Sequence, residues 1–128
     1  MQYSLTVGEN MYGRDHPDTS FLLGNLAILY ADQGKDEEAE LLYQRALAIK
    51  EKALGPEHPS TADTLNNLAL LYSEQGKYEE AEPLYQRALA IREKVFGLDH
   101  PFTKEVRENY TGLLQKMGQK TEGVDQQS

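Results

Sequence analysis

The chain has 128 residues and carries 21 acidic against 13 basic side chains, which gives a formal charge of −8. This acidic surplus disfavours nucleic acid and anionic membrane surfaces as partners, because both require a basic face, and the absence of cysteine excludes disulfides, thiolate nucleophiles and thiolate zinc sites. No apolar run is long enough to span a bilayer and no signal-peptide pattern opens the chain, so we expect a cytoplasmic protein.

A repeat of 42 residues organises the chain. The His-Pro pair recurs at His16, His58 and His100, and residues 14–55 match residues 56–97 at 27 of 42 positions without a gap. Such a period indicates a stack of repeated units. The expected units are a partial repeat at 1–13 that holds only a second helix, full repeats at 14–55 and 56–97, a partial repeat at 98–118 that holds only a first helix, and a polar, disordered tail at 119–128.

Each full unit is predicted to contain two helices. Apolar residues at helical spacing place them, in chain order after the partial unit, at 17–33, 36–54, 59–75, 78–96 and 101–117. Proline stands at the first position of each first helix, where its missing N–H costs nothing, and Gly34, Gly76 and Gly118 stand where a left-handed C-cap would end it. Pro83 is the one local conflict and should bend its helix slightly. No segment alternates with a period of two, so the predicted fold is an all-α stack of antiparallel helix pairs.

The second full unit carries a recognisable series of residues. It reads Leu65, Leu68, Ala69, Tyr72, Gly76, Ala81, Tyr85 and Ala88. This series resembles the tetratricopeptide repeat, and the 42-residue length together with residues 65–101 resembles the kinesin light chain type of that repeat. The resemblance covers residues 14–119, and more weakly 2–13. It implies a right-handed superhelical solenoid whose first helices line a concave groove that binds peptides.

The resemblance also implies which positions face the groove. They are Phe21, Asn25, Ile28, Asp32, Asp63, Asn66, Asn67, Leu70, Glu74, Glu105, Glu108 and Asn109, followed by Lys116.

Two chemical features of these positions have alternative interpretations. Asn25, Asn67 and Asn109 match the family position that hydrogen-bonds the backbone of a bound peptide, but they could instead brace neighbouring helices. The positions hold five acids and one base, Lys116. This excess of acids favours a negative groove that binds a basic or amphipathic peptide. The alternative is that these acids form only a solvated face of the protein.

No pattern in the chain predicts catalysis. Each histidine occupies the same loop of its own repeat, about 10 Å from the next, so the three cannot share one metal ion, and capping of helix starts explains them better. No serine is placed with a histidine and an acid, and no glycine-rich phosphate loop occurs. We expect no catalytic residue, no metal site and no cofactor.

The leading hypothesis is a non-catalytic protein-binding module or scaffold that recruits a peptide segment of a partner protein. The first alternative is a structural unit that forms a homodimer by stacking its open repeat ends or exchanging a terminal helix, through residues such as Leu5, Val7, Met11 and Tyr12. The second alternative is a fragment of a larger signalling scaffold.

Overall fold

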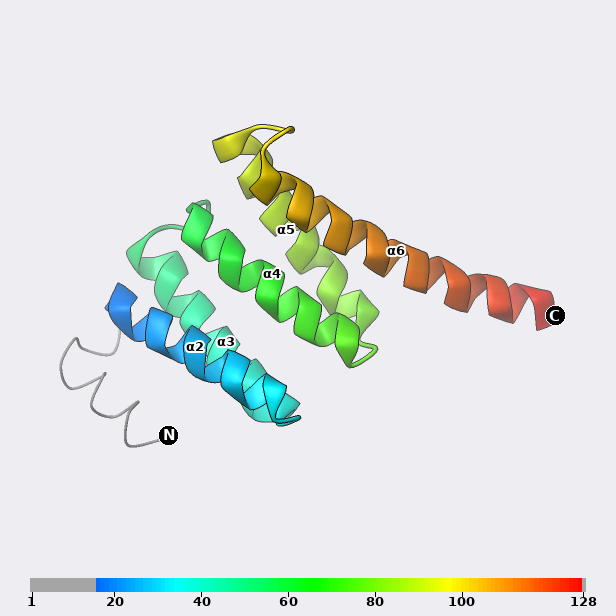
Figure 1. Ribbon diagram of the computed structural model, residues 1–128, viewed down its shortest axis with the longest axis horizontal. Coiled ribbons are helices and arrows are strands. Elements are labelled where there is room, and N and C mark those ends of the chain that lie inside the picture. The colour runs from blue at the N-terminus through cyan, green and yellow to red at the C-terminus, as the bar shows by residue number, and fades with distance from the viewer. Residues whose placement is uncertain (1–15, 128) are drawn as a thin grey trace.

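The computed structural model describes residues 16–127, and this part of the chain contains five helices and no strand. They are α2 (Pro17–Asp32), α3 (Asp36–Ala53), α4 (Pro59–Glu74), α5 (Tyr78–Phe96) and α6 (Pro101–Gln127). Figure 1 shows α2, α4 and α6 running the same way in one layer, with α3 and α5 returning behind them. The predicted all-α stack of helix pairs is confirmed. The predicted helix at 1–13 lies outside the described residues.

The histidines begin the first helices. In each repeat, Nδ1 accepts a hydrogen bond from the backbone N–H two residues later, at 3.1 Å for His16, 3.0 Å for His58 and 3.1 Å for His100. Each bond satisfies one of the donors that a helix start leaves unpaired. The prediction that these side chains cap helices is therefore confirmed, and their Nδ1 atoms are occupied by the backbone.

Replacing a capping histidine gives a direct test of this role. We expect His58→Ala to lower the free energy of unfolding by about 1 kcal/mol, because the N–H of Ser60 loses its acceptor. His58→Asn, which keeps an acceptor at the same position, should recover most of that loss. Urea denaturation of the three proteins measures the difference, and equal stability of the alanine variant and the parent would exclude the cap.

Glycine ends α2 and α4 as predicted. Gly34 and Gly76 have φ of 81° and 79°, a left-handed conformation that costs other residues about 1–2 kcal/mol. After α2, the N–H of Gly34 donates to Ala31 at 3.0 Å and the N–H of Lys35 donates to Tyr30 at 2.8 Å. This pair of bonds satisfies carbonyls that the helix end would otherwise leave unpaired. Pro83 lies inside α5, which remains one continuous helix; the expected bend stays a prediction.

The C-terminal part of α6 differs from the prediction. We expected Gly118 to end this helix and a disordered tail to follow, but α6 continues to Gln127 and projects beyond the stack in Figure 1. Gly34 and Gly76 are each followed by a second helix. Burial of the apolar stripe of that helix against the first helix stabilises the reversal of the chain. After Gly118, the positions equivalent to Ala81 and Tyr85 are Gly123 and Gln127. A reversal of the chain at Gly118 would therefore bury no apolar stripe, and the backbone keeps its helical hydrogen bonds instead.

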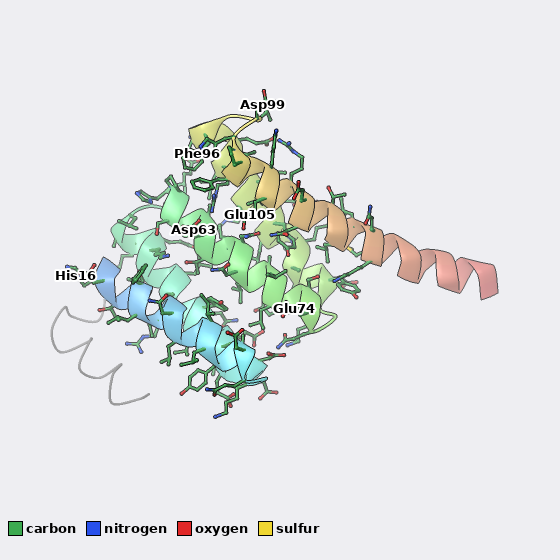
Figure 2. The ribbon with its side chains drawn as sticks, in the orientation of Figure 1. His16, Asp63, Glu74, Phe96, Asp99 and Glu105 are labelled. Atoms are coloured by element: carbon green, nitrogen blue, oxygen red, sulfur yellow. The ribbon has the colours of Figure 1, made fainter. Side chains whose placement is uncertain are left out.

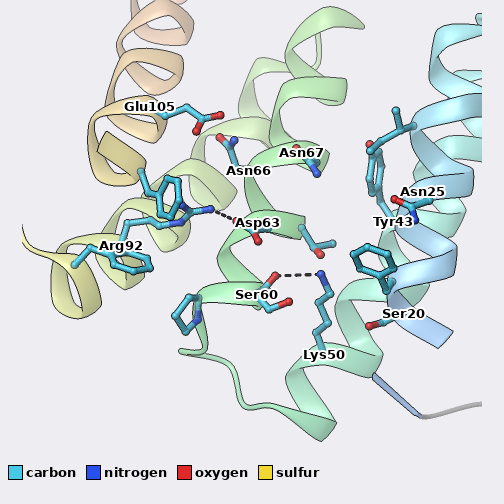
Figure 3. A pocket seen from close by; sticks show the side chains of 17 residues that line it. Ser20, Asn25, Tyr43, Lys50, Ser60, Asp63, Asn66, Asn67, Arg92 and Glu105 are labelled. Atoms are coloured by element: carbon cyan, nitrogen blue, oxygen red, sulfur yellow. Dashed lines mark hydrogen bonds and ion pairs between the residues drawn. The ribbon is translucent and has the colours of Figure 1, made fainter. Parts of the chain in front are cut away.

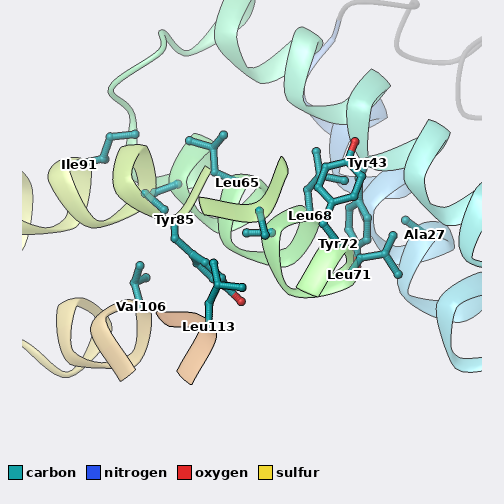
Figure 4. Packing of buried hydrophobic residues seen from close by; sticks show 14 of the residues in the cluster. Ala27, Tyr43, Leu65, Leu68, Leu71, Tyr72, Tyr85, Ile91, Val106 and Leu113 are labelled. Atoms are coloured by element: carbon teal, nitrogen blue, oxygen red, sulfur yellow. The ribbon is translucent and has the colours of Figure 1, made fainter. Parts of the chain in front are cut away.

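The core runs between the repeats. Leu65, Leu68, Leu71, Tyr85 and other buried side chains from α2 to α6 form one cluster, shown in Figure 4. Alanines 27, 39, 69 and 81, all fully buried, let the helices approach closely. The core therefore holds the first helices at a fixed spacing, and this spacing shapes the surface that they present.

Candidate functional site

A cavity of about 600 Å³ opens on the layer formed by the first helices. Figure 3 shows side chains from α2, α4 and α6 on its walls, with α3 and α5 contributing from behind. Seven of the twelve groove residues expected from the sequence line it: Phe21, Asn25, Ile28, Asp63, Asn66, Asn67 and Glu105. The other five lie outside its lining: Asp32, Leu70, Glu74, Glu108 and Asn109.

Two cations at the back of the cavity were not among the expected site residues. Lys50 of α3 donates from Nζ to the backbone oxygen of Ser60 at 3.2 Å, and Arg92 of α5 forms an ion pair with Asp63 of α4. Figure 3 shows these two bases on either side of Asp63. Burial lowers the pKa of the Lys50 ammonium, while the charge of Asp63 opposes that shift. One of the five predicted acids is therefore already neutralised by the protein itself.

Lys50 and Arg92 lie near the C-terminal ends of α3 and α5, where a positive charge is also favourable for the helix dipole. Both line the cavity, and the side chain of Arg92 is only 6% exposed. A signal for this was present in the sequence: the two occupy the same repeat position, and Arg92 follows Tyr85 and Ala88 at the spacing of one helix face.

Aromatic rings supply the apolar part of the cavity. Phe96 and Phe102 meet edge to face with centroids 5.4 Å apart, and the guanidinium of Arg92 lies 5.3 Å from the ring of Phe102. Phe21 on α2 and Phe102 on α6 nevertheless remain 65% and 48% exposed. Large apolar side chains that stay open at a cavity are available for contact with a partner.

The asparagines divide into two groups. The amide of Asn109 donates to Oδ1 of Asn66 at 3.2 Å, so this pair joins α6 to α4. Asn25 and Asn67 line the cavity, and their side chains make no hydrogen bond to any other group in residues 16–127. Bracing thus accounts for Asn66 and Asn109, whereas Asn25 and Asn67 keep both amide functions free to bind a ligand.

The remaining groove acids carry unneutralised charge. Asp32, Glu74, Glu105 and Glu108 form no ion pair within the described part of the chain. Figure 2 shows Asp63 and Glu74 toward opposite ends of α4, which eleven residues of helix place about 16 Å apart. Four of the five acids therefore form two areas: Asp63 and Glu105 at the cavity, and Asp32 and Glu74 at the ends of their helices.

Tyr43 belongs to the cavity, and its pKa also depends on the acids of the second area. It lines the cavity and is 5% exposed. Its pKa is raised to about 12, mainly by burial and further by the charges of Asp32 and Glu74. Two carboxylates from different repeats thus add to the effect of burial on the pKa of one tyrosine.

Two other classes of site have no counterpart in the same residues. No group of three or more histidine, cysteine, aspartate or glutamate side chains in residues 16–127 is arranged to hold a metal ion. Within that range, no helix combines the length and the apolar composition needed to cross a membrane.

The fold and the cavity define a class of protein: an α-helical solenoid of paired helices with a lined groove. The family of the tetratricopeptide repeat matches this chain over residues 22–60 and 61–102. The chain belongs to that family, and its helix pairs form the right-handed superhelical stack typical of it. No curated protein matched the chain by sequence.

Solved structures specify the type of repeat. A putative kinesin light chain from Podosopora anserina, with nearly identical TPR-like repeats, has a TM-score of 0.74, and a variant form of the same protein has 0.76; each is 27% identical over 94% of this chain and 57% of that one. BtubC (BKLC) from P. vanneervenii has a TM-score of 0.74 and 28% identity over 79% of this chain and 40% of that one. This chain is thus a kinesin light chain-like repeat protein that spans about half the length of these neighbours.

Proposed function

We propose that the chain is a non-catalytic protein-interaction module that binds a peptide segment of a cytoplasmic partner along the layer of first helices. The observation that carries this proposal is the 600 Å³ cavity, where the unbonded amides of Asn25 and Asn67 lie beside the exposed ring of Phe21. Amides that both donate and accept suit the backbone of a peptide, and the ring suits one of its apolar side chains.

Charge favours a basic or amphipathic peptide over an acidic one. Four of the five groove acids are unneutralised in the described part, whereas Lys50 is half-buried and bonded to Ser60, and Arg92 is paired with Asp63. The five groove acids still outnumber the three bases Lys50, Arg92 and Lys116, which supports a negative groove. Peptide arrays at low and high salt would test this: basic peptides should bind best at low salt, and a preference for acidic peptides would contradict the proposal.

The two groups of asparagines allow a sharper test. We expect Asn25→Ala with Asn67→Ala to weaken peptide binding by about tenfold with little change in stability, since each lost amide removes about 0.5–1.5 kcal/mol of hydrogen bonding. The matched variant, Asn66→Ala with Asn109→Ala, should instead lower the midpoint of thermal unfolding, because it removes the bond between α4 and α6. Calorimetry of binding and of unfolding separates the two, and unchanged affinity in the first variant would argue against the amides as ligand contacts.

A second candidate function is self-assembly through the N-terminal end of the stack. Leu29 of α2 is 47% exposed, whereas the repeat-equivalent Leu71 and Leu113 are 3% and 1% exposed. Leu22 is 38% exposed, whereas the equivalent Val106 is 1% exposed. A second helix from another copy could cover this face and produce a homodimer. Light scattering would decide: a concentration-dependent dimer that Leu29→Lys abolishes supports assembly, and a monomer at all concentrations excludes it.

A place within a larger scaffold is compatible with both candidates. The solved neighbours are longer chains, of which this chain spans 40% to 57%. We infer that any signalling activity would belong to such a larger protein, while this segment contributes the binding surface.

A further inference from the structure

A guanidinium group of the protein itself already forms part of the cavity wall. The side chain of Arg92 is only 6% exposed, and it forms an ion pair with Asp63, whose side chain is 58% exposed. The guanidinium also lies 6.0 Å from the ring centroid of Phe96 and 5.3 Å from that of Phe102. Two kinds of contact therefore hold this planar cation in the cavity wall: a carboxylate and aromatic rings.

Glu105 on α6 has the repeat position of Asp63 and lines the same cavity. It is exposed, and no ion pair or hydrogen bond reaches its carboxylate from any residue in 16–127. Figure 3 shows this carboxylate directed from α6 toward α4. Glu105 therefore presents to the cavity a carboxylate like that of Asp63, but without a base beside it.

An aromatic ring accompanies this carboxylate. Phe102 precedes Glu105 by three residues on α6, so the two side chains share one face of the helix, and both line the cavity. Phe102 remains 48% exposed although it contacts Arg92 and meets Phe96 edge to face. Part of its ring is therefore open to a second group, next to an acid that lacks a cation.

The other charged groups of the cavity are already bonded within the protein. The lining contains two bases, Lys50 and Arg92, and two acids, Asp63 and Glu105. Lys50 donates to the backbone oxygen of Ser60 at 3.2 Å, and Arg92 pairs with Asp63. Among the described residues, Glu105 is thus the charge of the lining that has no bonded partner, and its sign calls for a cation.

We propose that Glu105 and Phe102, here called the arginine subsite, bind an arginine side chain of the partner peptide. Glu105 pairs with the guanidinium through hydrogen bonds, and the exposed part of the Phe102 ring lies against its planar face, as Asp63 and the neighbouring rings hold Arg92. Lysine fits less well, because its ammonium has no planar face. This proposal rests on the proposed function, since it specifies the basic residue of the bound peptide and leaves its apolar residue at Phe21.

Fluorescence anisotropy with three labelled peptides tests the arginine subsite. The first alternates leucine with arginine; in the others, lysine or citrulline, the neutral isostere of arginine, replaces every arginine. The unaltered protein should bind the arginine peptide most tightly and the citrulline peptide about tenfold more weakly, since hydrogen bonds to charged groups are the stronger ones. Glu105→Gln should weaken the arginine peptide by about tenfold and the citrulline peptide by less than about twofold.

Matched variants separate the subsite from the general charge of the groove. Glu108→Gln removes the same charge three residues further along α6, outside the cavity lining, and should change the affinity for the arginine peptide by less than about twofold. Phe102→Leu should weaken the arginine peptide by about threefold and the citrulline peptide less. Phe21→Leu should weaken all three peptides alike, because this ring contacts their apolar residues.

Each result supports or overturns a distinct statement. A loss in Glu105→Gln that is confined to the charged peptides, with the fold intact by circular dichroism, supports the arginine subsite. Unchanged affinity in Glu105→Gln, or an equal loss in Glu108→Gln, overturns the subsite and leaves the basic-peptide groove standing. If the unaltered protein binds the arginine and citrulline peptides equally, the proposed preference for basic partners fails, and the subsite fails with it.

Discussion

Leu71→Ala is expected to lower the free energy of unfolding by about 3 kcal/mol, and Leu29→Ala by less than about 1 kcal/mol. The two leucines occupy the same position of successive repeats and undergo the same chemical change. Leu71 is 3% exposed in the cluster between the repeats, whereas Leu29 is 47% exposed at the N-terminal end of the described stack. Truncation of the buried side chain leaves a cavity, and truncation of the exposed one does not.

Urea denaturation of both variants measures this contrast. A small domain is stable by only about 5–15 kcal/mol, so the Leu71 variant should show a clearly lower midpoint with an unchanged slope. If Leu29→Ala is as destabilising as Leu71→Ala, Leu29 is covered in solution. Repeating the measurement over a range of protein concentrations then separates coverage by a second copy from coverage by the same chain.

Alkaline pH is expected to destabilise the fold by several kcal/mol between pH 10 and pH 12. The pKa of Tyr43 and that of Tyr85 are both raised from 10.0 to about 12, chiefly by burial. Because the folded state favours the neutral phenol, it retains protons that the unfolded chain releases above pH 10, and stability falls as the pH rises towards 12. A shift of this size corresponds to roughly 3 kcal/mol for each tyrosine.

Phenylalanine variants test this origin of the alkaline instability. The Tyr85 hydroxyl is buried without a hydrogen-bond partner in the described residues, so Tyr85→Phe should leave stability at pH 7 unchanged or higher by about 1 kcal/mol. At pH 11 the same variant should exceed the parent by a larger margin, as urea denaturation at both pH values would show. An identical loss of stability with pH in the parent and the variant would place the titrating group elsewhere.

The helices and their ends were predictable because they depend on interactions between residues that are close in sequence. The His-Pro starts and the Gly34 and Gly76 ends depend on hydrogen bonds within a few residues, and these bonds are specified by neighbouring side chains. The family was predictable for the same reason, since apolar spacing repeats every 42 residues. The prediction failed at Gly118, where the outcome depends on whether a second helix follows and packs back.

Repeat position indicates which side chains share a surface but not which charges are paired there. Asn25, Asn67 and Asp63, expected on one surface, line the same cavity. Repeat position did not indicate that Arg92 neutralises Asp63, because the two lie on different helices that only packing brings together. The same limit applies to Asn66 and Asn109, whose hydrogen bond joins two repeats.

The sequence by itself determined the period, the helix pairs, the caps and the family of this protein. The tertiary structure decided which of two equivalent leucines is buried, which groove acid is paired, and which asparagines bond to each other. The physical reason is that hydrogen bonds within a helix are specified by residues a turn apart. Burial and electrostatics, in contrast, depend on the groups that a neighbouring repeat places across the interface.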